Sequence, residues 1–185
     1  ATHLFACSKA AGNWMFGNRR FTVIKNGISL KKYAFSVASR TSCRAEIEGN
    51  AATIIGCVGR LDPQKNPLFA VEIARQLCLL DSSVHVVFIG DGELRTQVAD
   101  AIEKAHLTER VHLLGARDDV NQWYSAFDCL MMPSLFEGLP FVLVEAQAAS
   151  LPCVVSTEVS LDANITGLVE YVPLRESAQE WAQNI

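Results

Sequence analysis

A regular alternation of short apolar runs with helical segments constrains this chain more than any other feature. The runs rich in valine, isoleucine and leucine, which we predict to be strands, are residues 53–59, 84–90, 111–115, 128–134, 151–156 and 167–173. Helical spacing of apolar residues predicts helices at 66–80, 93–105, 119–127, about 140–149 and from about 177. Strands and helices in this order form a parallel sheet with helices on both faces. The expected fold class is therefore α/β, with a Rossmann-like, doubly wound parallel sheet.

Composition restricts the class of protein further. Of 185 residues, 50% are apolar, which is enough to bury a full core. The formal net charge of −4 argues against a nucleic-acid-binding protein, because such proteins are usually basic. The sequence contains no apolar stretch of membrane-spanning length and no signal-peptide pattern. Its cysteines are scattered without a CxxC pair, and Cys57, Cys129 and Cys153 fit strands as small buried residues, so we expect a cytoplasmic protein.

Unusual residues follow the predicted strands, at the edge where doubly wound sheets bind ligands. The first loop contains Gly59, Arg60 and Lys65. Arginine offers a planar fork of donors for phosphate oxygens, and lysine offers a mobile point charge, so we interpret this pair as an anion site. Two solvated surface cations are the alternative. The next loop, Gly90–Gly92, is not a dinucleotide fingerprint because Arg95 stands in place of the third glycine, so a tight turn and a ligand contact stay equally open.

A helix start after the fourth predicted strand offers a second phosphate contact. Gly138, Leu139 and Phe141 lie where free backbone N–H groups and the positive end of the helix dipole favour an anion. Pro140 has no N–H group, but at the first helical position it presets the backbone angle. We therefore predict a phosphate at this helix start.

Two glutamates flank that helix start. Glu145 is expected near the middle of the helix, facing the same crevice, where its carboxylate can accept both O–H groups of a ribose diol. Glu137 precedes the helix, where a second polyol would lie. Together they predict a ligand made of nucleotide, pyrophosphate and sugar. The alternative is that Glu137 caps the helix and Glu145 is a partly exposed side chain.

Several ordered motifs resemble one family over nearly the whole chain. They are "VGRLDPQKN", "PSLFEGLPFVLVEA" and the segment "LLG…DDV…W…A". These motifs, with the spacing of Glu137 and Glu145, resemble the retaining glycosyltransferases of family 4, which have the two-domain GT-B fold. The resemblance implies that the chain is the C-terminal, nucleotide-sugar-binding half of a GT-B glycosyltransferase. Its last residues are most similar to members that build capsular or extracellular polysaccharide.

The resemblance also implies roles for the site residues. Glu145 would hold the ribose, Glu137 would position the donor sugar, and Arg117 would border the base. Arg60 and Lys65 would neutralise the diphosphate. The donor-binding residues implied in this way are Gly59, Arg60, Lys65, Arg117, Phe136, Glu137, Gly138, Leu139, Phe141, Val142 and Glu145, with Glu137, Arg60 and Lys65 as the catalytic candidates.

The same resemblance divides the chain in two. It implies that residues 1–36 are a remnant of an N-terminal acceptor domain and its linker, and that residues 37–185 are the donor domain, truncated at its C-terminus. Most of the acceptor domain would then be missing, so residues 1–185 alone are expected to be inactive. Ser29 and Ser150 stand where the family usually has Asp and Gly, which affects local turns only.

The intact protein would transfer a sugar from a UDP-sugar or GDP-sugar to a glycan or lipid-linked acceptor in polysaccharide biosynthesis. Cations and helix N–H groups would stabilise the leaving diphosphate, without a metal or other cofactor. The four histidines show no metal-ligand spacing, and His85 and His112 fit structural roles. We expect no nucleic-acid partner, and peripheral contact of the intact protein with the inner face of the membrane. A non-catalytic nucleotide-sugar-binding module and a nucleotide-sugar epimerase of the same fold are the alternatives.

Overall fold

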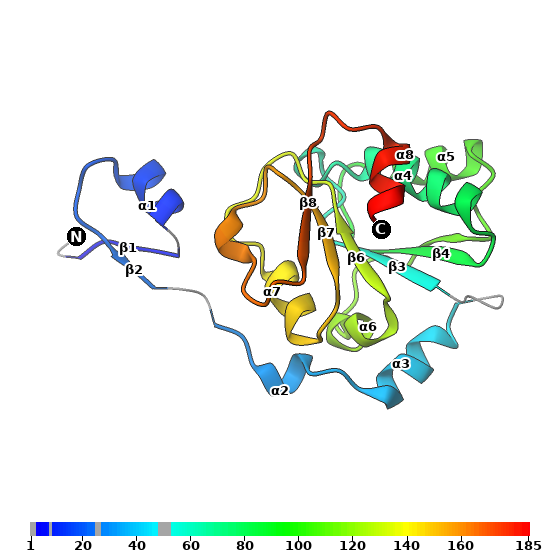
Figure 1. Ribbon diagram of the computed structural model, residues 1–185, viewed down its shortest axis with the longest axis horizontal. Helices are drawn as coiled ribbons and strands as arrows, with labels where there is room; N and C mark the ends of the chain where they lie inside the picture. The colour runs from blue at the N-terminus through cyan, green and yellow to red at the C-terminus, as the bar shows by residue number, and fades with distance from the viewer. Residues whose placement is uncertain (1–2, 8, 25–26, 48–52) are drawn as a thin grey trace.

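The computed structural model describes residues 3–7, 9–24, 27–47 and 53–185. Its centre is a sheet of parallel strands in the order β5-β4-β3-β6-β7-β8 (Figure 1). These strands are β3 (Thr53–Val58), β4 (Val84–Ile89), β5 (Val111–Leu113), β6 (Cys129–Met132), β7 (Cys153–Ser156) and β8 (Val169–Val172). The predicted α/β fold with a doubly wound parallel sheet is confirmed. Each strand is shorter than the predicted run, because the flanking residues of each run belong to the connecting loops.

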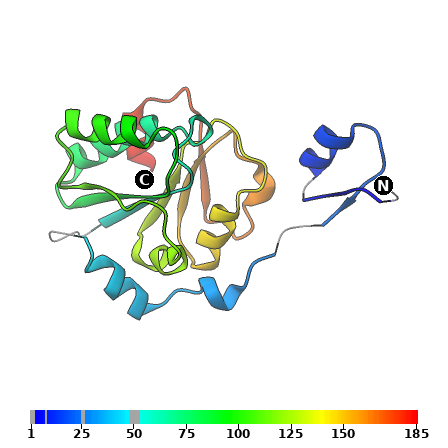
Figure 2. The ribbon, with the colours of Figure 1, turned by 180° about the vertical axis from the view of Figure 1, so that it is seen from behind.

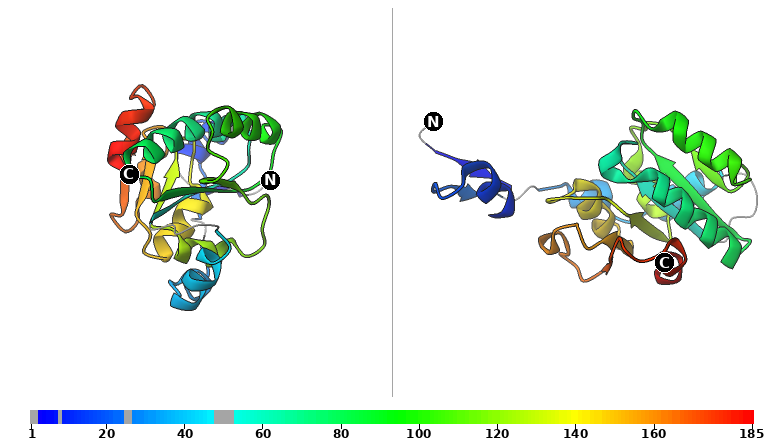
Figure 3. Two further views of the ribbon diagram at one scale, coloured as in Figure 1. Left: turned by 90° about the vertical axis from the view of Figure 1, so that its right-hand side faces the viewer. Right: turned by 90° about the horizontal axis from the view of Figure 1, so that it is seen from above.

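Helices cover both faces of the sheet, as Figure 3 shows in its left-hand view. On one face lie α3 (Val37–Arg44), α6 (Val120–Ala126) and α7 (Phe141–Ala148), and on the other lie α4 (Pro67–Leu80), α5 (Arg95–Lys104) and α8 (Ala178–Asn184). Successive side chains of a strand point to opposite faces, so Ile54 of β3 joins the first core and Ile55 joins the second. Both isoleucines are almost fully buried. The short 3₁₀ turns η1 (Pro63–Lys65) and η2 (Leu161–Ala163) lie in loops.

The starts of α8 and α4 differ in how they are capped. The Ser177 hydroxyl accepts a hydrogen bond from the Glu180 N–H (3.2 Å), and the Glu180 carboxylate accepts one from the Ser177 N–H (2.7 Å). This reciprocal capping box starts α8 where it was predicted. Asn66, at the start of the predicted helix 66–80, precedes α4; it adopts a left-handed conformation with φ of 53°, and its side chain caps no N–H group.

The start of α7 differs from the prediction. Pro140 has an extended ψ of 124° and is the residue before the helix, so Phe141 is the first helical residue. Among the described residues, no side chain caps the first turn of α7. The predicted alternative that Glu137 caps this helix is therefore wrong. Likewise α5 begins at Arg95, two residues later than the pattern of apolar residues predicted.

The N-terminal residues form a small unit of their own. Strands β1 (Phe5–Ala6) and β2 (Thr22–Val23) pair in parallel, and α1 (Lys9–Phe16) connects them. Gly12 of α1 lies so close to Phe21 that a Cβ atom there would come within 2.1 Å of the ring. Figures 1 and 2 show this unit to one side of the main sheet. The chain then passes through α2 (Leu30–Tyr33) and runs along the face of the main sheet that α6 covers.

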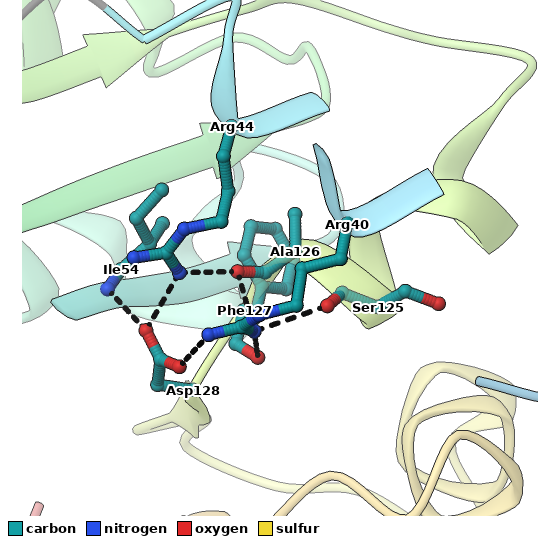
Figure 4. Close-up of polar contacts among 7 residues, drawn as sticks. All are labelled: Arg40, Arg44, Ile54, Ser125, Ala126, Phe127 and Asp128. Carbon is teal, nitrogen blue, oxygen red and sulfur yellow. Dashed lines mark hydrogen bonds and ion pairs between the residues drawn. The ribbon is translucent and has the colours of Figure 1, made fainter. Parts of the chain in front are cut away.

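A cluster of charges attaches α3 to the main sheet (Figure 4). The Asp128 carboxylate accepts hydrogen bonds from Arg40 (2.6 Å), Arg44 (2.9 Å) and the Ile54 N–H group (2.8 Å). Arg44 also donates to the Ala126 carbonyl oxygen at 2.9 Å. Burial would raise the pKa of Asp128, but the hydrogen bonds from Arg40, Ile54 and Arg44 outweigh it and hold that pKa below its usual value. Asp128 thus joins α3 to the starts of β3 and β6.

Candidate functional site

The site predicted from the sequence lies where the strand order reverses, between β3 and β6. Strands β4 and β5 extend the sheet from β3 in one direction, while β7 and β8 extend it from β6 in the other. Doubly wound sheets leave a crevice beyond the carboxyl ends of the strands at such a point. The loops that follow β3 and β6 are joined there, because the Leu135 N–H donates to the Gln64 carbonyl oxygen (2.8 Å) and the Gln64 amide donates to that of Phe136 (3.0 Å).

Glycines allow the loops after β3 and β4 to touch. A Cβ atom on Gly90 would lie 1.9 Å from the Gly59 carbonyl oxygen, and one on Gly92 would lie 2.4 Å from that of Leu61. Gly90 also has a φ of 143°, which side chains rarely adopt. These contacts favour the tight-turn interpretation of residues 90–92. Gly59 in turn packs against the aliphatic part of Lys65, 3.2 Å from the position of its absent Cβ.

Lys65 and Glu137 form an ion pair at the centre of the site. The two residues are 72 positions apart, and their side chains are only 19% and 10% exposed. Such a pair is screened little by water, so each charge restrains the other strongly. Two residues that the sequence assigned to the same ligand are therefore side by side, and each is the other's partner in the free protein.

Arg60 is placed differently from Lys65. Its side chain is 74% exposed and pairs with Asp62 at 2.9 Å. Asp62 also accepts a hydrogen bond from the Lys65 N–H group (3.1 Å), which starts η1. The guanidinium is exposed to solvent, so its ion pair with Asp62 contributes little to stability.

The start of α7 presents an open surface. Apart from the two neighbouring residues, no atom of the described part of the chain lies within 4 Å of the position where Gly138 would carry a Cβ atom, and Phe136 and Phe141 are exposed. The loop itself is anchored, because the Glu137 N–H donates to the carbonyl oxygen of Glu158 (3.1 Å). The Glu137 carbonyl oxygen accepts a hydrogen bond from the Ser160 N–H (3.2 Å). Leu139 and Val142 are half-buried and pack on the core. An uncapped helix start on a fixed loop can receive an anion.

Glu145 is half-buried and accepts a hydrogen bond from a tyrosine. The Tyr124 hydroxyl donates a hydrogen bond to Oε2 of Glu145 at 2.8 Å. Burial, followed by the neighbouring Glu145 carboxylate, raises the pKa of the Tyr33 hydroxyl. The sequence pattern predicted neither tyrosine as a site residue, because both contacts join different elements and no local spacing marks them.

Arg117 lies beyond β5, outside the cluster formed by Lys65 and Glu137. It donates to Asp119 through two nitrogens at 2.7 Å each and to Glu46 at 2.9 Å. Its guanidinium also lies over the Trp123 ring, 5.2 Å from the ring centre. The hydrogen bond with Asp119 is the main reason why the pKa of Arg117 is raised. Two carboxylates thus hold Arg117 in one orientation.

The described residues form neither a metal-binding cluster nor a membrane-spanning helix. These residues contain no group of three or more histidine, cysteine, aspartate or glutamate side chains that could hold a metal ion. His85 and His112 instead stack on each other, with a distance of 2.9 Å between Nδ1 of His85 and Nε2 of His112. In the same part of the chain, no helix has the length and apolar character needed to cross a membrane.

Comparison with known sequences gives one family. The sequence pattern of the family described as "Glycosyl transferases group 1" matches residues 52–185. EpsF of Bacillus subtilis, which is named as a glycosyltransferase, is 36% identical over 194 residues, covering 100% of this chain and 50% of EpsF. The UDP-Gal:alpha-D-GlcNAc-diphosphoundecaprenol alpha-1,3-galactosyltransferase of Escherichia coli is 37% identical over 143 residues, covering 74% of this chain and 36% of that enzyme. The chain thus spans half or less of the length of these relatives.

Solved structures share the fold. HepE of Anabaena, in complex with UDP and glucose, has a TM-score of 0.87 at 22% identity, covering 100% of this chain and 52% of HepE. The C-terminal domain of the glycosyl transferase group 1 family protein LpcC from Francisella tularensis has a TM-score of 0.71 at 18% identity, covering 85% of each chain. The fold is that of the C-terminal domains of GT-B glycosyltransferases.

Proposed function

This chain belongs to the glycosyl transferases group 1 family, and on that premise we propose that it is the donor-binding half of a retaining glycosyltransferase that uses a UDP-sugar. The observation that carries the proposal is the meeting of Lys65, Glu137 and the uncapped start of α7 at the sheet's switch point. A cation, free N–H groups and a carboxylate on one crevice suit a phosphorylated sugar.

Each group has a distinct task in this proposal. Lys65 and the first turn of α7 bind the diphosphate, and the exposed Arg60 side chain contacts it from the loop that follows β3. Glu145 accepts the ribose hydroxyls, and Glu137 accepts hydroxyls of the donor sugar. Uridine is proposed as the base because HepE is solved with UDP and the E. coli relative is named for a UDP-sugar. Arg117 would border that base from beyond β5.

The proposed reaction breaks the bond between the sugar C1 and the diphosphate oxygen. The acceptor oxygen bonds to C1 on the same face, and its proton passes to the departing phosphate. Negative charge therefore grows on the diphosphate, where Lys65, Arg60 and the α7 N–H groups stabilise it. Glu137 is already paired with Lys65, so its proposed role is to orient the sugar and not to attack it.

The acceptor is proposed to bind outside residues 37–185. We propose that residues 1–36 are the end of the acceptor domain and its linker, which is consistent with the parallel unit formed by β1, α1 and β2. A glycan or lipid-linked acceptor in polysaccharide biosynthesis is supported by the diphosphoundecaprenol in the name of the E. coli relative. Use of a nucleotide-sugar donor is consistent with an intact protein that acts in the cytoplasm, at the inner face of the membrane.

Calorimetric titration of this chain tests donor binding. UDP should bind more tightly than UMP, because Lys65 and the α7 start both address phosphate and each charge-assisted hydrogen bond contributes about 1.5–3 kcal/mol. GDP should bind more weakly than UDP if uridine is the base. Equal affinities for UDP and UMP would refute the diphosphate site.

Two glutamate variants separate the proposed roles. Glu145→Gln should weaken UDP binding by roughly 1–3 kcal/mol, because the amide loses the charge that faces the ribose. Glu137→Gln should not weaken UDP binding, since it frees Lys65 for the phosphate, but it should abolish the additional affinity for a UDP-sugar. Glu170→Gln, on an exposed position of β8, is the matched control. Equal loss of UDP binding in both site variants would overturn this division of roles.

A further inference from the structure

Gln147, near the end of α7, is a polar side chain buried in the core and only 4% exposed. Its Nε2 atom donates to the carbonyl oxygen of Leu143 in the same helix (2.9 Å) and to that of Ala163 (2.8 Å). Its Oε1 atom accepts hydrogen bonds from the Ile165 N–H (2.9 Å), the Thr166 N–H (3.1 Å) and the Thr166 hydroxyl (3.0 Å). Both polar atoms of the amide therefore have partners, in the orientation that places Nε2 against carbonyl oxygens.

Most of these partners belong to the β7–β8 connection, which comprises residues 157–168 and lies beside α7 in Figure 1. Four of the five hydrogen bonds of Gln147 reach it, and the fifth stays within α7. The connection contains η2, whose last residue, Ala163, is fully buried. Separation of the connection from α7 would leave a buried amide and several backbone groups without partners, which is unfavourable. Gln147 thus holds the second half of the β7–β8 connection against α7.

The first half of the same connection holds the backbone of Glu137. The Glu137 N–H donates to the Glu158 carbonyl oxygen (3.1 Å), and the Ser160 N–H donates to the Glu137 carbonyl oxygen (3.2 Å). These bonds pair Glu137 with Val159 as a parallel bridge, and Val159 is only 2% exposed. The position of Glu137 therefore depends on a connection whose other half is fixed by Gln147.

We propose that Gln147 is a positioning residue for Glu137, acting through the β7–β8 connection. This rests on the proposed function, in which Glu137 orients the donor sugar. Without the amide of Gln147 the connection would separate from α7 more often, and Glu137 would lose the strand-like pairing that fixes its backbone. A displacement of about 1 Å is enough to disturb the alignment of a reacting group. The diphosphate contacts proposed for Lys65 and the first turn of α7 do not use this connection.

Hydrogen exchange of the free protein tests the coupling without a ligand. Gln147→Met keeps a side chain of similar length and removes the amide. The N–H groups of Glu137 and Ser160 should then exchange at least about tenfold faster, because local opening of the connection becomes easier. Asp128→Asn is the matched control, since Asp128 joins α3 to β3 and β6. In that control the two N–H groups should be accelerated no more than those of β4. The same result in Gln147→Met would mean that Gln147 supports only the fold as a whole, and the proposal would be wrong.

Gln147→Glu adds a conservative variant with a pH readout. The introduced carboxyl keeps an acceptor for the N–H groups of residues 165–166, but when ionised it turns a negative oxygen towards the carbonyl oxygens of Leu143 and Ala163. Burial raises the pKa of such a carboxyl, and protonation restores one donor. Relative to the wild type at the same pH, exchange of the Glu137 N–H should be fast at about pH 8 and approach the wild-type rate at about pH 5. A wild-type rate at both pH values would show that the donor bonds of Gln147 do not hold the connection.

Calorimetric titration with UDP, UDP-glucose and UDP-galactose connects the position of Glu137 to the sugar. Gln147→Met should keep the affinity for UDP within about twofold and reduce the additional affinity for the better UDP-sugar by about three- to tenfold. Equal losses for UDP and the UDP-sugar would mean that Gln147 acts on α7 as a whole, which overturns its role towards Glu137. If the wild type binds neither UDP-sugar more tightly than UDP, the proposed sugar contact of Glu137 fails. The exchange of the Glu137 N–H then decides by itself whether Gln147 positions that residue.

Discussion

Replacement of Asp128 by asparagine should destabilise the fold far more than loss of an ordinary surface charge. Asp128 accepts hydrogen bonds from Arg40, Arg44 and the Ile54 N–H group. An asparagine side chain keeps one acceptor oxygen, but its NH₂ group would face a donor, and both guanidinium groups would lose the negative charge of Asp128. The substitution therefore removes a negative charge that two partly buried cations share.

The magnitude follows from the burial of the three side chains. Breaking a fully buried ion pair costs about 3–5 kcal/mol. Asp128, Arg40 and Arg44 are 29%, 33% and 19% exposed, so water recovers part of that loss. We expect Asp128→Asn to lower the free energy of unfolding by about 2–3 kcal/mol. For a chain of this size the melting temperature should fall by about 4–12 °C.

Urea and thermal unfolding at several pH values provide the assay. The pKa of Asp128 in the folded protein is lowered, so its contribution to stability is full above the unfolded value of about 3.9 and is lost as the pH falls through the folded-state pKa. The difference between wild type and variant should be constant from about pH 5 to 8 and shrink in acid. Glu72→Gln, which breaks an exposed pair with Arg75, is the control and should cost less than about 0.5 kcal/mol. Equal losses in both variants, or a difference that grows in acid, would refute the reasoning.

Two backbone positions give opposite predictions for stability. Ser150 has a left-handed φ of 59°, a conformation that costs a side chain about 1–2 kcal/mol, so Ser150→Gly should stabilise the protein by roughly 0.5–1 kcal/mol after the added flexibility of the unfolded chain is counted. A lower unfolding midpoint in urea would contradict this. Gly90→Ala should destabilise the protein by at least about 2 kcal/mol, because its Cβ atom would collide with the Gly59 carbonyl oxygen and force the loops after β3 and β4 apart. An unchanged melting temperature would show that these loops adjust freely.

The order of elements was determined by local sequence signals. Apolar periodicity predicted the helices and strands of the main sheet, since burial of one face imposes that period on the side chains. The start of the last helix near Ser177 was predicted, and the structure adds the capping box that Ser177 forms with Glu180. The segment Val37–Arg44 was not predicted as a helix, because Cys43 is its only buried residue and it shows no apolar stripe. Its attachment depends on Asp128, which is remote in sequence.

The partners of the site residues were decided only by the tertiary structure. The motif around Glu137 and Glu145 identified both carboxylates as unusual, but not that Lys65 lies beside the first and two tyrosines beside the second. Lys65 and Glu137 meet because β3 and β6 are neighbours in the sheet although β4 and β5 lie between them in the chain. Periodicity records which face of an element is buried, and it carries no information about which distant element covers that face. The order of the strands in the sheet determines which elements are neighbours, and so which charged side chain lies beside Glu137.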